Sequence, residues 1–337
     1  RLSADARQIS RSPARDRLNV TNGSDGTGAA TGPGWLVSGL EDDIRPHMFA
    51  AAEGGEPFAL ATIVAADGGP RPVGAQMVVT ESASWGFLSG GCIEDDVALN
   101  ARAAIADGKV RRLVYGEGSP FVDIRLPCGG RIEVVIERVG PRDKAVEDLQ
   151  RLTAQRRSAQ WSSDGDQRIC LSVEQASETA PIRKLYVPIQ RLIVIGSDPF
   201  ALAIGGMGRT LGWEVTLLSP FGPSEAAPLG LDCDRRALDE AFAGLALDRW
   251  SAVAVATHDL DLDERALVPA LRSQAGYVGV LGSRRKLPDR IERLAAAGLS
   301  RAQIERLRAP IGLAIPARSP WEVAVSVIAE VIAARGE

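Results

Sequence analysis

The order of apolar and polar residues changes character along the chain. Between residues 57 and 139, apolar segments alternate with turn-rich ones and predict strands at FALATIVAA, QMVVT, WGFLS, VRRLVYG and RIEVVIERV. One helix interrupts them, since apolar residues recur at helical spacing: Ile93, Val97, Ala101, Ala104 and Ile105. Gly108 is placed to end that helix in a left-handed conformation. With a short helix expected at residues 35–52, the pattern predicts an α+β domain at 36–140.

A different pattern begins at residue 191. The segments RLIVIG, WEVTLLSP, WSAVAVAT and YVGVLG read as apolar strands, and helical segments alternate with them. Such strands, buried on both faces, are typical of a parallel sheet, so residues 189–337 are predicted to form a Rossmann-like, doubly wound domain. The last helix has a start signal of its own, with Ser319 as N-cap, Pro320 in the first helical position and Glu322 completing a capping box.

Two segments carry weaker patterns. Residues 1–35 are rich in Gly, Ser, Thr and Asn towards their end and are expected to form a flexible tail. Residues 141–188 predict one helix (142–157) and a hairpin around SSDGD, and are interpreted as a connecting subdomain. The fold class is therefore α/β, with an N-terminal α+β domain followed by a Rossmann-like domain.

Composition narrows the function classes. The 337 residues have a formal net charge of −4, which provides no field for nucleic acid, and no apolar stretch approaches a membrane span. The four cysteines form no C-x-x-C pair and the two histidines have no metal-ligand spacing, so neither a disulfide framework nor a zinc site is expected. The N-terminal stretch lacks the apolar core of a secretory signal. A reduced cytoplasmic setting is the resulting expectation, and a homodimer is expected from the apolar-rich α/β character of the chain.

The turn after RLIVIG is a poor dinucleotide site. A Rossmann fingerprint requires G-x-G-x-x-G/A there and an acid at the end of the next strand. This chain has GSDPFA, in which Asp198 replaces the second glycine, and its next strand ends in Leu218-Ser219-Pro220. A carboxylate at that position repels phosphate. A domain retained for packing or for another ligand is at least as well supported as NAD binding.

A better anion site follows the strand YVGVLG. Gly282 and Ser283 come at its carboxyl end, where open α/β sheets bind ligands, and Arg284 and Arg285 offer forked donors to phosphate. Ser283 could cap the next turn. Thr257, His258 and Asp259 end another strand and are expected to face the same crevice, with His258 as an acid/base or a hydrogen-bond donor. A capped helix with solvated arginines and a structural histidine are the alternatives.

Two cysteines lie next to paired glycines. Gly90 and Gly91 precede Cys92 at a strand-to-helix junction, where the helix dipole favours a thiolate and the acids from Glu94 to Asp96 oppose one. Cys128 precedes Gly129 and Gly130 just before a strand. The glycines would let a ligand approach the backbone, and the thiols would contact a cofactor or its incoming sulfur. Buried structural cysteines are the commoner case and the alternative.

Together these segments resemble the XdhC/CoxI family, the xanthine dehydrogenase accessory factors. The first domain contributes ATIVAADGGPRPVGAQMVV, GFLSGGCIEDDV and LPCGGRIEVVIE, and the second contributes VAVATHDLDLDERAL, YVGVLGSRRK, APIGL and SPWEVAVSVIAEVIA. The resemblance covers roughly residues 36–337 and is weakest in the middle segment. GSDPFA and LLSP depart from the more orthodox glycine turn and acidic strand end of many relatives, and GGPRP replaces a more usual small hydroxyl before PR. These departures resemble a branch that serves aldehyde oxidase-type enzymes.

The resemblance implies an accessory role without turnover of its own. Such a protein binds the molybdenum cofactor as cargo, as molybdopterin or its cytosine dinucleotide form. It supports sulfuration by a cysteine desulfurase or sulfurtransferase and delivers the cofactor to a molybdenum hydroxylase apoenzyme. The residues carried over by position are Gly90, Gly91, Cys92, Glu94, Cys128, Gly129, Gly130, Thr257, His258, Asp259, Gly282, Ser283, Arg284 and Arg285. The alternatives are an NAD(P)-dependent oxidoreductase and a docking protein without a ligand.

Overall fold

The computed structural model describes residues 37–69, 71–117, 119, 126, 129–176 and 179–336. The predicted tail at 1–35 and the candidate residue Cys128 lie outside these ranges.

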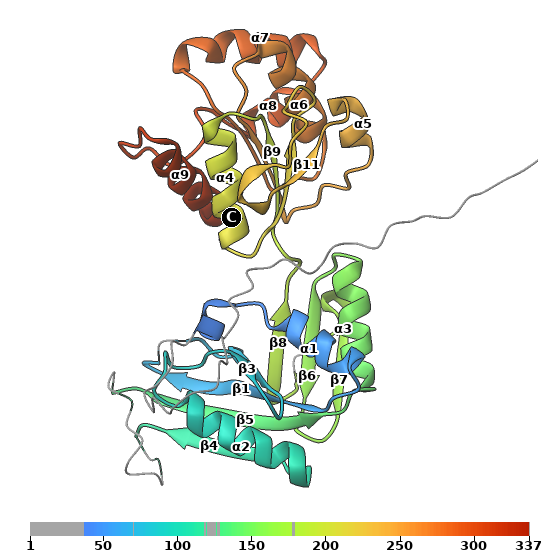
Figure 1. Cartoon of the computed structure of the whole chain (residues 1–337), viewed down its shortest axis with the longest axis vertical. Coiled ribbons are helices and arrows are strands. Elements are labelled where there is room, and N and C mark those ends of the chain that lie inside the picture. Colours follow the sequence, from blue (N-terminus) through green and yellow to red (C-terminus); the bar gives the residue numbers. More distant parts are fainter. Residues whose placement is uncertain are drawn as a thin grey trace, which may run out of the picture. The chain divides into compact units, whose positions relative to one another are not determined.

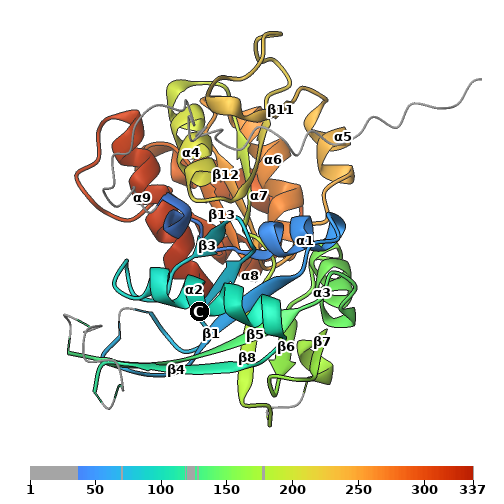
Figure 2. The ribbon, with the colours of Figure 1, turned by 60° about the horizontal axis from the view of Figure 1, so that its bottom comes forward.

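The first domain is built on a five-stranded antiparallel sheet with the order β3-β2-β1-β5-β4. Its strands are β1 (Phe58–Asp67), β2 (Gln76–Val79), β3 (Ser84–Gly86), β4 (Arg111–Tyr115) and β5 (Arg131–Val139). Helix α2 (Glu94–Asp107) packs on β1 and β5 and runs along the sheet in Figure 2. Gly108 ends it with a φ of 73°, as the sequence predicted. These elements confirm the α+β pattern.

The helix predicted at residues 35–52 is wrong in its extent. A 3-10 helix, η1 (Val37–Leu40), is followed by the non-helical residues 41–44, and α1 begins only at Arg45 and runs to Glu53. Pro46 explains the start of α1, because proline lacks an amide donor and is favoured in the first helical turn. Three consecutive acids, Glu41 to Asp43, therefore lie in a non-helical segment ahead of the helix.

Residues 141–188 form a helix and a second small sheet. Helix α3 (Lys144–Ala154) precedes β6 (Ala159–Ser163), β7 (Arg168–Ser172), η2 (Val173–Gln175) and β8 (Ile182–Tyr186), with the strand order β7-β6-β8. The predicted hairpin is confirmed by the antiparallel pairing of β6 with β7. Trp161 is fully buried in a cluster with Phe58, and its indole donates to the Glu137 carboxylate at 3.2 Å. This segment therefore shares a core with the first sheet, while the domain boundaries remain predictions.

The second domain contains a six-stranded parallel sheet with the order β11-β10-β9-β12-β13-β14. Its strands are β9 (Arg191–Ile195), β10 (Glu214–Leu218), β11 (Asp232–Asp234), β12 (Ser251–Val255), β13 (Tyr277–Val280) and β14 (Leu307–Arg308). This is the strand order of a Rossmann fold, so the predicted architecture is confirmed. The order reverses between β9 and β12, and the carboxyl ends of these two strands are where such folds bind ligands.

Helices cover both faces of the parallel sheet. On one face α4 (Pro199–Thr210) packs beside α9 (Pro320–Ala333), as Figure 1 shows, and the capping box at Ser319 is present. The other face buries side chains from α5 (Leu238–Ala243), α6 (Leu260–Arg272) and α7 (Leu287–Ala296). The remaining elements are short: η3 (Pro228–Gly230), η4 (Arg284–Lys286), α8 (Arg301–Glu305) and η5 (Ala334–Gly336).

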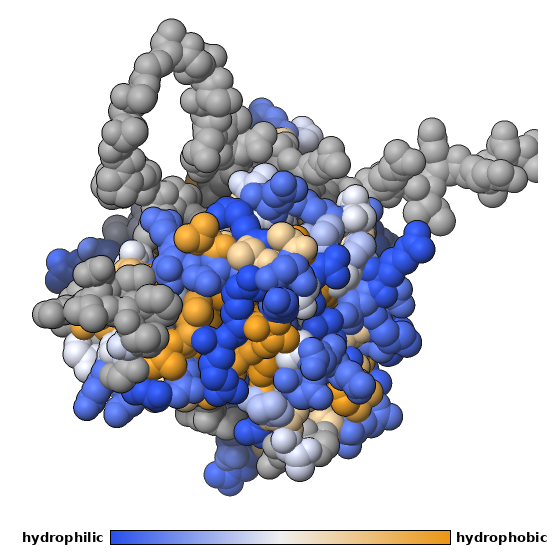
Figure 3. All heavy atoms as spheres, turned by 90° about the horizontal axis from the view of Figure 1, so that it is seen from below, coloured by the Kyte–Doolittle hydropathy of each residue, from blue (hydrophilic) through white to orange (hydrophobic). Residues whose placement is uncertain are grey.

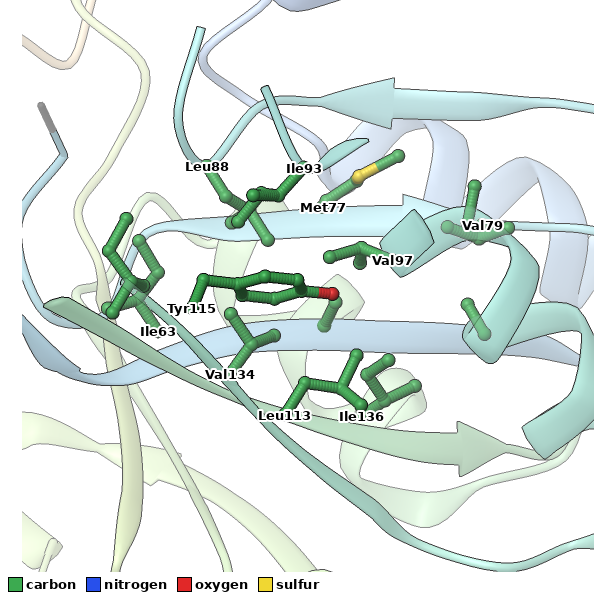
Figure 4. Close-up of a cluster of buried hydrophobic side chains, with 14 of the residues drawn as sticks. Ile63, Met77, Val79, Leu88, Ile93, Val97, Leu113, Tyr115, Val134 and Ile136 are labelled. Carbon is green, nitrogen blue, oxygen red and sulfur yellow. The ribbon is translucent and has the colours of Figure 1, made fainter. Parts of the chain in front are cut away.

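The core between the first sheet and α2 is closely packed around an aromatic ring. Figure 4 shows the Tyr115 ring lying among labelled aliphatic side chains from both layers, including Leu88 and Ile93. Its hydroxyl donates to the Asp96 carboxylate of α2 at 2.5 Å. This core therefore fixes Leu88 and Ile93, which stand on either side of residues 89–92 and so of Cys92.

Within the described ranges, none of the helices is both long and apolar enough to cross a membrane. On the face shown in Figure 3, hydrophilic residues divide the hydrophobic ones into separate patches.

Candidate functional site

The loop of residues 89–92, which includes Cys92, lies between β3 and α2. Leu88 and Ile93 flank it, and each is at most 1% exposed, so both ends are anchored in the core. Gly90 and Gly91 have φ angles of 93° and 107°, a region that residues with side chains rarely adopt. Cys92 is exposed. The backbone thus brings the thiol to the surface on a short, anchored loop, which we call the glycine loop (residues 89–92).

The glycine loop closes around the Glu94 carboxylate. One carboxylate oxygen accepts from the amides of Leu88 at 2.9 Å and Ser89 at 2.7 Å. The other accepts from the Gly91 amide and from the Ser89 hydroxyl, both at 2.8 Å. Longer bonds of 3.2 Å come from the amides of Gly90 and Ile93. The glycines therefore direct their amides inward, towards an anion that the chain itself supplies.

This carboxylate is charged despite its burial. Glu94 is only 6% exposed, and burial alone raises its pKa. The hydrogen bonds donated by Ser89 and Leu88 outweigh that effect and lower the pKa overall. The structure thus gives Gly90, Gly91 and Glu94 an internal role. Contact between the loop and a cofactor remains a prediction, and only the exposed Cys92 has its side chain free for it.

The second pair of glycines also has an internal contact. A Cβ on Gly130 would lie 2.7 Å from the Gly68 carbonyl oxygen, and a Cβ on Gly116 would lie 1.9 Å from that of Gly130. Three backbone segments therefore approach one another too closely for any side chain there. A Cβ on Gly129 would meet no atom within 4 Å, although its φ of 72° favours glycine. Cys128 lies outside the described residues.

In the second domain, an acid stands at the helix start where Rossmann folds bind phosphate. Asp198 is the N-cap of α4, and its carboxylate accepts from the Ala201 amide at 2.8 Å. Its other oxygen lies 3.1 Å from Nε2 of His258, which follows β12. The pair therefore bridges the two strand ends at the switch point of the sheet. Gly196 is required there because a Cβ would lie 2.4 Å from the Ala256 carbonyl oxygen.

The other two residues after β12 form local hydrogen bonds. Thr257 is 8% exposed and its hydroxyl donates to the Asp263 carboxylate at 2.5 Å. Asp259 is the N-cap of α6 and accepts from the amides of Asp261 and Leu262. The sequence predicted that Thr257, His258 and Asp259 share one crevice. Thr257 is buried, whereas His258 and Asp259 are exposed, and of these three only His258 directs its side chain to another strand end, at Asp198.

The loop after β13 presents a row of cations. Gly282, Ser283, Arg284, Arg285 and Lys286 are all exposed, and the last three form η4. No ion pair joins these three basic side chains to any other residue in the described ranges. Ser283 occupies the N-cap position of η4, but its side chain makes no capping hydrogen bond, so that part of the prediction is wrong. The arginines therefore remain available to an anion.

Two residues that hold this loop escaped the sequence analysis. Asp263 and Arg290 are buried, and the guanidinium donates to the carboxylate at 2.9 and 2.6 Å and to the Leu281 carbonyl oxygen at 3.2 Å. A Cβ on Gly282 would lie 2.8 Å from the same guanidinium. A signal did exist, since both charged residues fall on the apolar faces of their helices, Asp263 with Ala266 and Ala270.

Two surface hollows, of about 680 and 270 Å³, lie elsewhere, along β11 and between β1 and β8. Among the described residues no group of three His, Cys, Asp or Glu side chains is arranged to hold a metal ion. The arrangement can offer an exposed thiol on one domain and exposed guanidinium groups on the other.

Two family models match the chain. The model described as the XdhC and CoxI family matches residues 51–116, which include the glycine loop. The model described as the XdhC Rossmann domain matches residues 192–331.

Individual proteins match over most of their length. The molybdenum cofactor insertion chaperone PaoD of Escherichia coli K12 is 31% identical over 304 residues, which are 88% of this chain and 90% of that protein. A probable xanthine dehydrogenase subunit of Bacillus subtilis 168 is 27% identical over 87% of this chain and 98% of its own. A solved structure described as a xanthine dehydrogenase from Bacillus halodurans covers 86% of this chain and 95% of its own, with a TM-score of 0.68. At 22% identity, this last similarity shows the fold alone.

Proposed function

The chain belongs to the XdhC and CoxI family, and from this premise we propose that it is a molybdenum cofactor insertion chaperone for a molybdenum hydroxylase. The observation that carries the proposal is the similarity to PaoD, a chaperone of this name, over 88% of the chain. The cargo is molybdopterin or its cytosine dinucleotide form, bound without being consumed. The partner is the apoenzyme of a xanthine dehydrogenase or aldehyde oxidase-type enzyme.

The exposed groups suit such a cargo. A cysteine thiolate is a metal ligand, and Cys92 presents its thiol at the surface. Arg284 and Arg285 carry forked donors that match phosphate oxygens and have no ion-pair partner among the described residues. We assign Cys92, and with it Cys128, to contact with the metal end of the cargo, and the two arginines to a phosphate group.

The Rossmann strand order is also compatible with one alternative function, that of an NAD(P)-dependent oxidoreductase. A bound pyrophosphate would need the amides at the start of α4, and the Asp198 carboxylate already accepts from one of them. The same carboxylate would repel the phosphates. This observation favours the chaperone. A sulfurtransferase as second partner, a homodimer and a cytoplasmic location complete the proposal.

The test is to purify the chain and measure what it carries. The cofactor should be found by fluorescence of its pterin oxidation product, with molybdenum measured by mass spectrometry. Replacing Cys92 and Cys128 with serine, and separately Arg284 and Arg285 with glutamine, should reduce the bound cofactor and the activation of a client apoenzyme. Cys233→Ser is the matched control, because Cys233 is partly buried and lies in β11.

Each outcome decides a different part. No pterin in the purified chain, with tight NAD(P) binding instead, would replace the chaperone with the oxidoreductase. No ligand of either kind would leave a docking protein. Full cofactor retention and client activation in the double cysteine variant would remove the role of the thiols and keep the chaperone.

A further inference from the structure

The acids between η1 and α1 each pair with a base of the first domain. We call Glu41, Asp42 and Asp43 the acidic strap. Glu41 pairs with His47, whose ring stacks on Trp85 with centroids 4.3 Å apart. Asp42 pairs with Arg71 of the GGPRP turn, and Asp43 pairs with Arg45. The three acids of the strap thus pair with three basic side chains of the first domain.

The last two pairs differ in how completely the arginine is used. The Asp43 carboxylate accepts from both Nε and Nη2 of Arg45, at 2.8 and 3.0 Å, and the Arg45 side chain is 7% exposed. Asp42 accepts only from Nη2 of Arg71, and its own side chain is 79% exposed. Nε of Arg71 is buried and has no hydrogen-bond partner. The Asp42–Arg71 pair is therefore incomplete, and an exposed pair of this kind is weak.

Arg71 is held in place independently of Asp42. Its guanidinium lies over the Phe87 ring, 4.5 Å from the ring centroid. Phe87 directly precedes Leu88, the first residue whose amide donates to Glu94. Stacking on Phe87 therefore holds the Arg71 guanidinium next to the glycine loop. Its orientation does not depend on the ion pair with Asp42.

A second cation belongs to the same cluster, since Lys184 and Arg45 both lie over the Tyr186 ring. Lys184 of β8 is half-buried, lies over the Tyr186 ring at 5.9 Å and forms no hydrogen bond or ion pair with another described residue. Burial lowers the pKa of Lys184, and the neighbouring Asp42 opposes that effect. The charged groups that act on it are Asp42, Arg71, Asp43 and Arg45. With Lys184 this makes three cations against two carboxylates, a net charge of +1.

We propose that Arg71 and Lys184 form a binding site for a phosphate group, and that Asp42 occupies this site until a phosphate replaces it. A phosphate offers several oxygens and more than one negative charge, so it can accept from more than one guanidinium nitrogen, where Asp42 accepts from Nη2 of Arg71 alone. The ammonium of Lys184 adds a point charge on the same ligand. The natural ligand rests on the proposed function, which makes it a phosphate group of the cofactor, so this site and the arginines after β13 are two candidates for the same group.

The test is calorimetric titration with pyrophosphate alone. All variants carry Arg284→Gln and Arg285→Gln, so that the arginine pair after β13 does not contribute to binding. Asp42→Asn should tighten pyrophosphate binding about two- to fivefold, because a competing exposed ion pair is removed. Arg71→Gln should weaken binding at least about tenfold through the loss of charge-assisted hydrogen bonds. Lys184→Met should weaken binding as well, while it keeps the apolar stem over Tyr186.

Asp239→Asn is the matched control. Asp239 is 73% exposed and pairs with Arg265 at 3.0 Å, so the variant makes the same charge change at a similar exposed ion pair. If Asp42→Asn binds pyrophosphate no more tightly than Asp239→Asn, or if Arg71→Gln binds as its parent does, the site is wrong. Should Arg71→Gln fail to fold, Arg71→Lys keeps the charge without the fork and must still weaken binding.

The experiments distinguish a failure of this site from a failure of the proposed function. If the chain carries the pterin but its pyrophosphate affinity does not change when Asp42 or Arg71 is replaced, this site is wrong and the proposed function stands. The expected pyrophosphate response in a chain that carries no pterin would keep the site and overturn the proposed function.

Discussion

Asp263 and Arg290 form an ion pair inside the second domain, with side chains only 1% and 5% exposed. Asp263 also accepts from Thr257 after β12, and Arg290 donates to the carbonyl oxygen of Leu281 after β13. The pair therefore ties two neighbouring strand ends together. The row of exposed cations from Arg284 to Lys286 begins three residues after Leu281, so the pair also positions that row.

Arg290→Met should lower the free energy of unfolding by about 3–5 kcal/mol, because the Asp263 charge would remain buried without its partner. Urea denaturation at pH 7 measures the change. Arg265→Met removes an arginine from the exposed pair with Asp239 and should cost no more than about 1 kcal/mol. Equal losses in the two variants would show that the burial of the first pair has no energetic consequence.

Glu94→Gln should destabilise the protein at pH 7 by about 1–3 kcal/mol, since an amide group replaces one acceptor oxygen among buried donors. The effect should depend on pH. The pKa of Glu94 is lowered below its usual value of 4.5, so its ionised form stabilises the fold fully above pH 4.5. That contribution is lost as the pH falls through the lowered pKa. The gap between the native chain and the variant should therefore narrow in acid, and a constant gap would contradict the assignment.

Gly130→Ala should destabilise the first domain by about 1–3 kcal/mol, because the new methyl group would meet the backbone oxygens of Gly68 and Asp67 at 2.7 and 2.8 Å. Gly140→Ala is the control, since a Cβ there meets nothing within 4 Å. Thermal unfolding compares the two. If both substitutions are neutral, close packing does not explain the glycine at 130, and a role towards a ligand gains support.

Asp198→Ala should cost about 1 kcal/mol through the loss of the N-cap of α4. Asp198→Asn should cost less, because asparagine also caps helices and only the exposed pair with His258 is removed. Denaturant titrations of both variants measure the difference. Equal losses would mean that the ion pair, and not the cap, is what Asp198 contributes.

The sequence predicted most elements of both domains because their signals are local. Period-two and period-3.6 patterns located the strands and α2, and the helix signals at Gly108 and Ser319 depend only on adjacent residues. The prediction failed at residues 35–52, where a non-helical segment at 41–44 interrupts the expected helix and α1 begins only next to Pro46. Residues 141–188 showed a correct hairpin, but only packing revealed that Trp161 and Glu137 join it to the first sheet.

For the candidate site, too, some features follow from the sequence and others only from the tertiary structure. The sequence by itself determined which residue types stand at the strand ends and next to the paired glycines, and it carried the resemblance that led to the proposed function. Only the tertiary structure decided which way those groups face. Glu94 and Asp198 fill their own turns, Arg290 holds the loop after β13, and Asp42 covers Arg71. These pairings join groups that burial and charge bring together across the chain, and no local pattern records them.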